Sequence, residues 1–142
     1  MPSSTKKDTS RQTPKHQKTA FVYQNLPAII WMALIAMLTL TPSNTLTPNT
    51  LWGIELDKIA HITLFAVLTH LLTTGFWKQK NNSKINKNAQ LYAATTAIAY
   101  GGTIEILQNI LPIDRTSDLN DFLANNIGTT IGYLTTQLVR KK

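Results

Sequence analysis

The stretch DKIAHITLFAVLTHLLTTGFW, residues 57–77, decides what kind of fold this chain can form. Its formal charges lie only in the first turn, at Asp57 and Lys58. A helix of this length rises about 1.5 Å per residue and spans about 30 Å, which matches the hydrocarbon thickness of a bilayer. Phe76 and Trp77 end the stretch where membrane proteins carry interfacial aromatic side chains. The stretch therefore predicts a transmembrane helix.

Three further stretches are also poor in charge and long enough to cross a bilayer, at about residues 24–41, 89–111 and 119–139. The first two are followed by Pro42 and Pro112, and proline lacks the backbone N–H that a continuing helix needs. The last stretch is the least apolar, so its threonines must bond to carbonyls one turn earlier and its asparagines need protein partners. We therefore predict an all-α fold, an integral membrane bundle of four transmembrane helices at about residues 24–41, 57–77, 89–111 and 119–139.

The chain is basic, with 14 Lys and Arg against 7 Asp and Glu in 142 residues. Most of the cations fall in three clusters, which lie in the first 20 residues, at residues 78–87 and at residues 140–142. A four-pass chain places all three clusters on one side of the membrane, and the positive-inside rule identifies that side as the cytoplasm. Nucleic acid is not a predicted partner, because no aromatic residues alternate with the lysines and no nucleic-acid-binding motif accompanies them.

The charge pattern predicts three regions. Residues 1–22 are polar and positively charged and are expected to form a disordered cytoplasmic arm, residues 23–139 form the transmembrane domain, and residues 140–142 form a basic cytoplasmic tail. A secretory signal peptide is the competing interpretation of the N-terminal region, but no small-residue cleavage site follows Leu40. We expect a multi-pass protein of the cytoplasmic (inner) membrane with both termini in the cytoplasm.

The predicted topology gathers most of the remaining ionisable residues at the outer face of the membrane. Three pairs of polar residues each share one helix face, because their members are three or four residues apart. The pairs are Asp57 with His61, Glu105 with Gln108, and Asp121 with Asn125. Lys58 and Arg115 are the cations on this side and are available to the carboxylates. The predicted site is thus an outward-facing polar network of Asp57, Lys58, His61, Glu105, Gln108, Arg115, Asp121 and Asn125.

Two glycines continue the polar face of the last helix toward the membrane interior. Gly128 follows Asn125 by three residues, and Gly132 follows Gly128 by four. Small residues at this spacing let a second helix approach closely, so we expect them to serve helix packing.

These residues, in this order and spacing, resemble the VanZ-like family of membrane proteins over about residues 25–139. The resemblance rests on Asp57, Lys58, His61, Phe65, Glu105, Gln108, Arg115, Asp121, Asn125, Gly128 and Gly132. Asp118 stands where the family often has Ser, three residues after the arginine. The resemblance implies a small integral membrane protein of the kind linked to low-level teicoplanin resistance, and it implies no particular reaction.

The sequence leaves three functions open. In the leading hypothesis the polar site takes an envelope lipid or a lipid-linked cell-wall precursor, and the protein thereby modulates glycopeptide (teicoplanin) susceptibility. The second is an enzyme acting on envelope lipids, in which His61 is the general base and Glu105 the acid. The third is a purely structural role, in which an ion-pair network fixes three helices in a membrane interaction protein.

A bound metal is not expected from the sequence. Asp57, His61, Glu105 and Asp121 have suitable ligand types, but the two nearby cations argue against a divalent ion. The absence of cysteine excludes thiolate metal sites and disulfides. We therefore predict no metal and no other cofactor, with membrane lipids as the partners and the oligomeric state left open.

Overall fold

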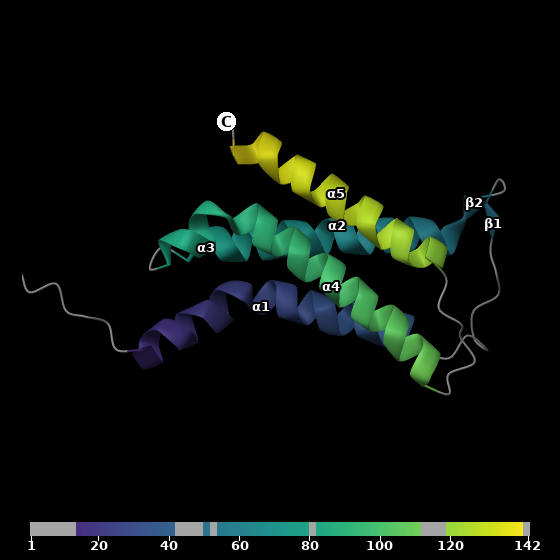
Figure 1. Ribbon diagram of the computed structural model, residues 1–142, viewed down its shortest axis with the longest axis horizontal. Helices are drawn as coiled ribbons and strands as arrows, with labels where there is room; N and C mark the ends of the chain where they lie inside the picture. The colour runs from purple at the N-terminus through teal and green to yellow at the C-terminus, as the bar shows by residue number, and fades with distance from the viewer. Residues whose placement is uncertain (1–13, 42–49, 52–53, 80–81, 112–118, 141–142) are drawn as a thin grey trace, which may run out of the picture.

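The computed structural model describes residues 14–41, 50–51, 54–79, 82–111 and 119–140, and most of them are helical (Figure 1). The long helices are α1 (Pro14–Thr39), α2 (Leu56–Trp77), α4 (Ala89–Ile110) and α5 (Leu119–Arg140). A short helix, α3 (Ser83–Lys87), lies between α2 and α4 in the chain, and two-residue strands β1 (Thr50–Leu51) and β2 (Ile54–Glu55) pair antiparallel before α2. The predicted all-α class is confirmed.

The helix bounds follow the sequence prediction closely except at the start of α1. The observed ends of α2, α4 and α5 lie within one residue of the predicted ends. Helix α1 begins at Pro14, not at residue 24, so residues 14–22 of the predicted arm are helical, and residues 1–13 lie outside the described residues. Proline suits a first turn because its missing N–H has no acceptor there. A second proline, Pro27, lies inside α1 and removes one backbone hydrogen bond from it.

Helix α2 lies at the centre of the bundle and contacts each of the other three long helices (Figure 1). Its buried Phe65, Leu68 and Leu72 form one hydrophobic cluster with Ile35 of α1 and Ala97 of α4. Because residues three and four apart share a helix face, one stripe of α2 supplies the middle of this cluster. The polar residues at the start of α2 are therefore positioned by a packed core one turn away.

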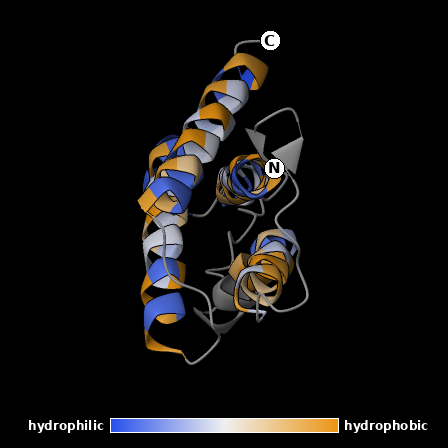
Figure 2. Ribbon diagram, turned by 90° about the vertical axis from the view of Figure 1, so that its right-hand side faces the viewer, coloured by the Kyte–Doolittle hydropathy of each residue, from blue (hydrophilic) through white to orange (hydrophobic). Residues whose placement is uncertain are grey.

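Two helices are long and apolar enough to cross a membrane, judged by length and composition: Phe21–Thr39 within α1, and Leu56–Trp77. Large apolar side chains are nevertheless exposed on all the long helices. Figure 2 shows hydrophobic residues along these helices. The most exposed are Met37, Leu119 and Ile110, each with more than 70% of its surface accessible. An apolar exterior of this extent is unusual for a monomeric soluble protein and suits a lipid environment.

Helices α2 and α5 approach each other closely at two glycines of α5. A Cβ atom on Gly128 would overlap the carbonyl oxygen of Ile62, and one on Gly132 would lie 2.5 Å from the carbonyl oxygen of Ala66. Only hydrogen can occupy these positions while the two backbones keep their present separation. The glycines therefore set the distance between α2 and α5.

Helix α1 is held to its neighbours by side chains that donate to backbone carbonyls. The indole N–H of Trp31 donates to the carbonyl of Leu64 on α2 at 2.9 Å, and the hydroxyl of Tyr100 on α4 donates to the carbonyl of Met32 at 2.6 Å. Both donors are partly buried, so the bonds also satisfy groups that would otherwise lose their partners. These bonds fix the rotation of α1 as well as its position.

Replacing Gly128 by alanine should separate α2 from α5. We expect Gly128→Ala to lower the free energy of unfolding by about 1–3 kcal/mol, the usual cost of overpacking, in an unfolding titration of detergent-solubilised protein. Gly102→Ala is the matched control, because its Cβ would lie 3.7 Å from the Phe122 ring, an ordinary contact. That control should be neutral or slightly stabilising, since alanine favours helix. Equal effects of the two variants would contradict the assignment.

Candidate functional site

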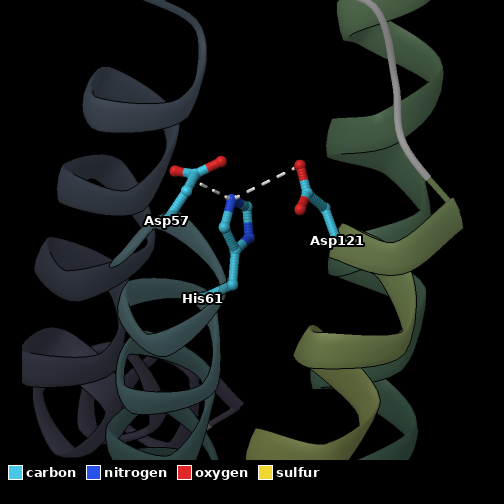
Figure 3. A group of neighbouring side chains, drawn as sticks. All are labelled: Asp57, His61 and Asp121. Carbon is cyan, nitrogen blue, oxygen red and sulfur yellow. Dashed lines mark ion pairs between the residues drawn. The ribbon is translucent and has the colours of Figure 1, made fainter. Parts of the chain in front are cut away.

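His61 is the centre of a polar cluster between the first turns of α2 and α5 (Figure 3). Its side chain is 2% exposed, and its Nδ1 atom lies 2.8 Å from Oδ1 of Asn125 on α5. Because an amide oxygen accepts hydrogen bonds, Nδ1 carries the hydrogen as the amide is oriented. The other ring nitrogen, Nε2, is then turned toward two carboxylates.

The two carboxylates belong to Asp57 and Asp121, one from each helix. Nε2 of His61 lies 3.9 Å from Oδ1 of Asp57 and 4.0 Å from Oδ2 of Asp121 (Figure 3). Both aspartates sit in the first turn of their helices, where the free backbone N–H groups and the helix dipole favour negative charge. Three ionisable groups thus converge between two helices that the Gly128 contact holds together.

The cluster is closed on one side and open on the other. The side chain of Asp121 is 12% exposed, whereas that of Asp57 is 53% exposed. Phe65 follows His61 by one turn of α2, and its ring is fully buried. A molecule from outside would therefore reach the cluster past Asp57 and would meet an apolar floor.

Four of the eight predicted network residues come together between α2 and α5. The four that meet are Asp57, His61, Asp121 and Asn125. Glu105 is buried on α4, but among the described residues the converging metal-type donor atoms belong to Asp57, His61 and Asp121. Gln108 donates to the backbone carbonyl of Thr39 at 2.9 Å and so ties α4 to the end of α1.

Of the two predicted cations, Lys58 is described by the structure and Arg115 is not. Lys58 is half-buried on α2, and as the residue after Asp57 it leaves the helix about 100° around the axis from that carboxylate. Arg115 lies outside the described residues.

Gly101 of α4 lies against two residues that surround His61. A Cβ there would lie 3.1 Å from the ring of Phe65 and 3.4 Å from Nδ2 of Asn125. Gly101 thus brings α4 against the layer that holds His61 in place. The sequence signal for this close contact is the presence of a glycine inside a helix. Glycine costs a helix about 1 kcal/mol relative to alanine, so its presence there indicates a close contact.

The arrangement can accept a proton or a cation. Asp57, His61 and Asp121 each offer one ligand atom, and these atoms all lie within 4.8 Å of one another. The same carboxylates can accept hydrogen bonds from hydroxyl or amine groups of a bound molecule. The cluster also joins α2 to α5 through the His61–Asn125 bond, so it contributes to the structure as well.

Helices of membrane-spanning length, an apolar exterior and a histidine–carboxylate cluster at one end define a small helical protein of the membrane-associated type. The chain belongs to the VanZ/LLP1 family, whose model matches residues 2–140. The family resemblance of the sequence is thereby confirmed. No protein of curated function and no solved structure shows significant similarity to the chain.

The bond between His61 and Asn125 should be visible as an energetic coupling. In a double-mutant cycle with His61→Ala and Asn125→Ala, we expect a coupling of about 1 kcal/mol or more in the free energy of unfolding, because the bond is buried. Asn126→Ala is the control, since the Asn126 amide donates to its own helix at the carbonyl of Phe122, 2.7 Å away. Additive effects at His61 and Asn125 would show that the bond does not stabilise the fold.

Proposed function

We propose that all four long helices cross the cytoplasmic membrane. The less apolar α4 and α5 support this, because their threonine hydroxyls donate within the helix: Thr103 bonds to the carbonyl of Ala99 and Thr130 to that of Asn126, both at 2.9 Å. Hydroxyls satisfied in this way are tolerated in lipid. The outer surface of α5 is a row of exposed apolar side chains: Leu119, Leu123, Ile127, Ile131, Leu134 and Leu138.

We place the His61 cluster on the outer side of that membrane. Figure 1 shows α3, which carries Lys84 and Lys87, at one end of the bundle and β1 and β2 at the other. The cluster lies at the strand end, because α2 and α5 begin there. By the positive-inside rule, the lysine-bearing end faces the cytoplasm and the cluster faces outward.

The function we propose is binding of the headgroup of an envelope lipid or a lipid-linked cell-wall precursor at this cluster, through which the protein modulates teicoplanin susceptibility. The observation that carries the proposal is a buried histidine, 2% exposed, beside a carboxylate that is 53% exposed. A polar cluster with one exposed carboxylate at the membrane surface suits a headgroup whose tail stays in lipid. Polar residues of this kind in membrane proteins are costly, which favours a functional use.

A purely structural role is the second candidate, and the His61–Asn125 bond between α2 and α5 favours it. The half-exposed Asp57 does not fit that role well, because a surface ion pair adds little to stability. An envelope-lipid enzyme would need Glu105 to act with His61. Among the described residues, the converging donor atoms are those of Asp57, His61 and Asp121, and this arrangement supports binding.

The proposed topology predicts the outcome of reporter fusions. Alkaline phosphatase fused after Asp118 should be active, because its disulfides form only outside the cytoplasm, whereas a fusion after Lys84 should be inactive. A cytoplasmic reporter such as green fluorescent protein should give the reverse pattern at the same two positions. Activity after Lys84 and none after Asp118 would place the cluster on the cytoplasmic side and overturn the outer-site proposal.

The headgroup proposal predicts a binding defect in variants of the cluster. We expect His61→Gln and Asp121→Asn to bind undecaprenyl phosphate at least about tenfold more weakly than the wild type in native mass spectrometry, equivalent to about 1.4 kcal/mol. The same variants should lose any effect of the protein on teicoplanin susceptibility in a host without an outer membrane. His70→Gln is the control, because His70 lies nine residues along α2 and faces about 180° away. Unchanged binding in both cluster variants would contradict the proposal.

A further inference from the structure

We propose that Asp57, His61 and Asp121 bind one divalent metal ion of the zinc or manganese type. Each residue offers one ligand atom, and the three atoms lie within 4.8 Å of one another. One imidazole nitrogen with two carboxylate oxygens is a donor set that these ions accept. The inference deepens the proposed headgroup site, and it rests on that proposal for the role of the ion but not for its binding.

The distances are those of atoms that can share an ion. Metal–ligand bonds of about 2.0–2.2 Å separate neighbouring ligand atoms by about 3.3–3.6 Å in a tetrahedral site. Nε2 of His61 lies 3.9 Å and 4.0 Å from the two carboxylate oxygens. Closing the two gaps to His61 needs a shift of about half an ångström. The three ligand atoms all lie within 4.8 Å of one another, so rotation of the two aspartate side chains must also bring their oxygens closer together.

The same distances are too long for a charged hydrogen bond. A protonated imidazole between two carboxylates normally makes bonds of about 2.7–2.9 Å to them. At 3.9 and 4.0 Å, Nε2 makes no hydrogen bond to either carboxylate, although the His61 side chain is only 2% exposed. His61 thus directs a buried nitrogen without a hydrogen-bond partner into the space between the two carboxylates (Figure 3).

Asn125 prepares this nitrogen to act as a ligand. By accepting from Nδ1 at 2.8 Å, its amide oxygen holds the proton on Nδ1 and leaves the lone pair of Nε2 directed at the carboxylates. Histidine ligands in metalloproteins are commonly oriented through the opposite ring nitrogen in this way. The proposed site therefore has a ligand set from two helices and a group that orients its histidine.

The ion would complete the chemistry of the headgroup site. The negative charge of a carboxylate repels a phosphate, whereas a divalent ion bound to the carboxylates attracts one. Three protein ligands leave a coordination position open, as in catalytic zinc sites. That position would face the exposed side of the cluster at Asp57, where a phosphate headgroup could enter.

The test uses the full chain, purified in detergent with a tag that contains no histidine and treated with EDTA. After the EDTA is removed, we expect one Mn²⁺ or Zn²⁺ to bind per chain in a calorimetric titration, and the melting temperature to rise with metal concentration. Asp57→Asn, His61→Gln and Asp121→Asn should each weaken binding at least tenfold. His70→Gln and Asp8→Asn should bind as the wild type does, since neither residue belongs to the three proposed ligands.

Asp57→Asn keeps the test decisive if the buried variants fail to fold, because the Asp57 side chain is 53% exposed and its loss should leave the fold intact. No binding at 1 mM metal, a concentration about at the weak end of protein metal sites, overturns the proposal. Binding that all three ligand variants retain overturns it too.

Undecaprenyl phosphate binding measured with and without EDTA separates the two proposals. Lipid binding that persists without metal, in a protein that binds no metal, overturns the metal site and leaves the headgroup function standing. Metal binding without lipid binding supports the metal site and overturns the headgroup function. Lipid binding that appears only with the metal supports both.

Discussion

The close contact between α2 and α5 is the constraint on which the rest of the structure depends. Gly128 and Gly132 let the backbone of α5 lie against the carbonyls of Ile62 and Ala66, a separation that any side chain would prevent. Because helices are stiff, that contact also fixes the distance between α2 and α5 one to two turns closer to their N-termini. The imidazole of His61 fills that gap and reaches α5 there.

Polar groups inside this bundle are satisfied largely by backbone carbonyls, which shows how a sequence so poor in charge holds its helices together. Trp31 and Gln108 donate to carbonyls of neighbouring helices, whereas most of the threonines that bond do so to their own helix. In a low-dielectric environment, a buried donor without an acceptor costs free energy. Such hydrogen bonds therefore stabilise the bundle and also favour one rotation of each helix about its axis. The His61 cluster differs because it concentrates ionisable groups in one place, and that difference makes it the candidate site.

Much of the architecture could be predicted because its signals are local. Charge-poor stretches followed by Pro42 and Pro112 located the ends of α1 and α4 to within two residues. A spacing of four residues placed Asp57 with His61 and Asp121 with Asn125. The start of α1 was missed because residues 14–22 are polar, and polarity says little about helix formation outside a membrane. The short α3 and the paired strands lie between the predicted helices, where no element was predicted, because they are too short to carry a periodic signal.

The sequence by itself determined the helical class, the family and the pairs of polar residues on each helix, because helix periodicity and charge pattern are properties of neighbouring residues. Only the tertiary structure decided which pairs meet. Glu105 with Gln108 looked equivalent to the other two pairs, yet Gln108 bonds to the end of α1 while Asp57, His61 and Asp121 converge. The physical reason is that the rotation of each helix about its axis is set by packing, here by the glycine contacts of α5 and the hydrogen bonds of α1. That rotation depends on contacts between residues far apart in the chain, which local sequence patterns do not reveal.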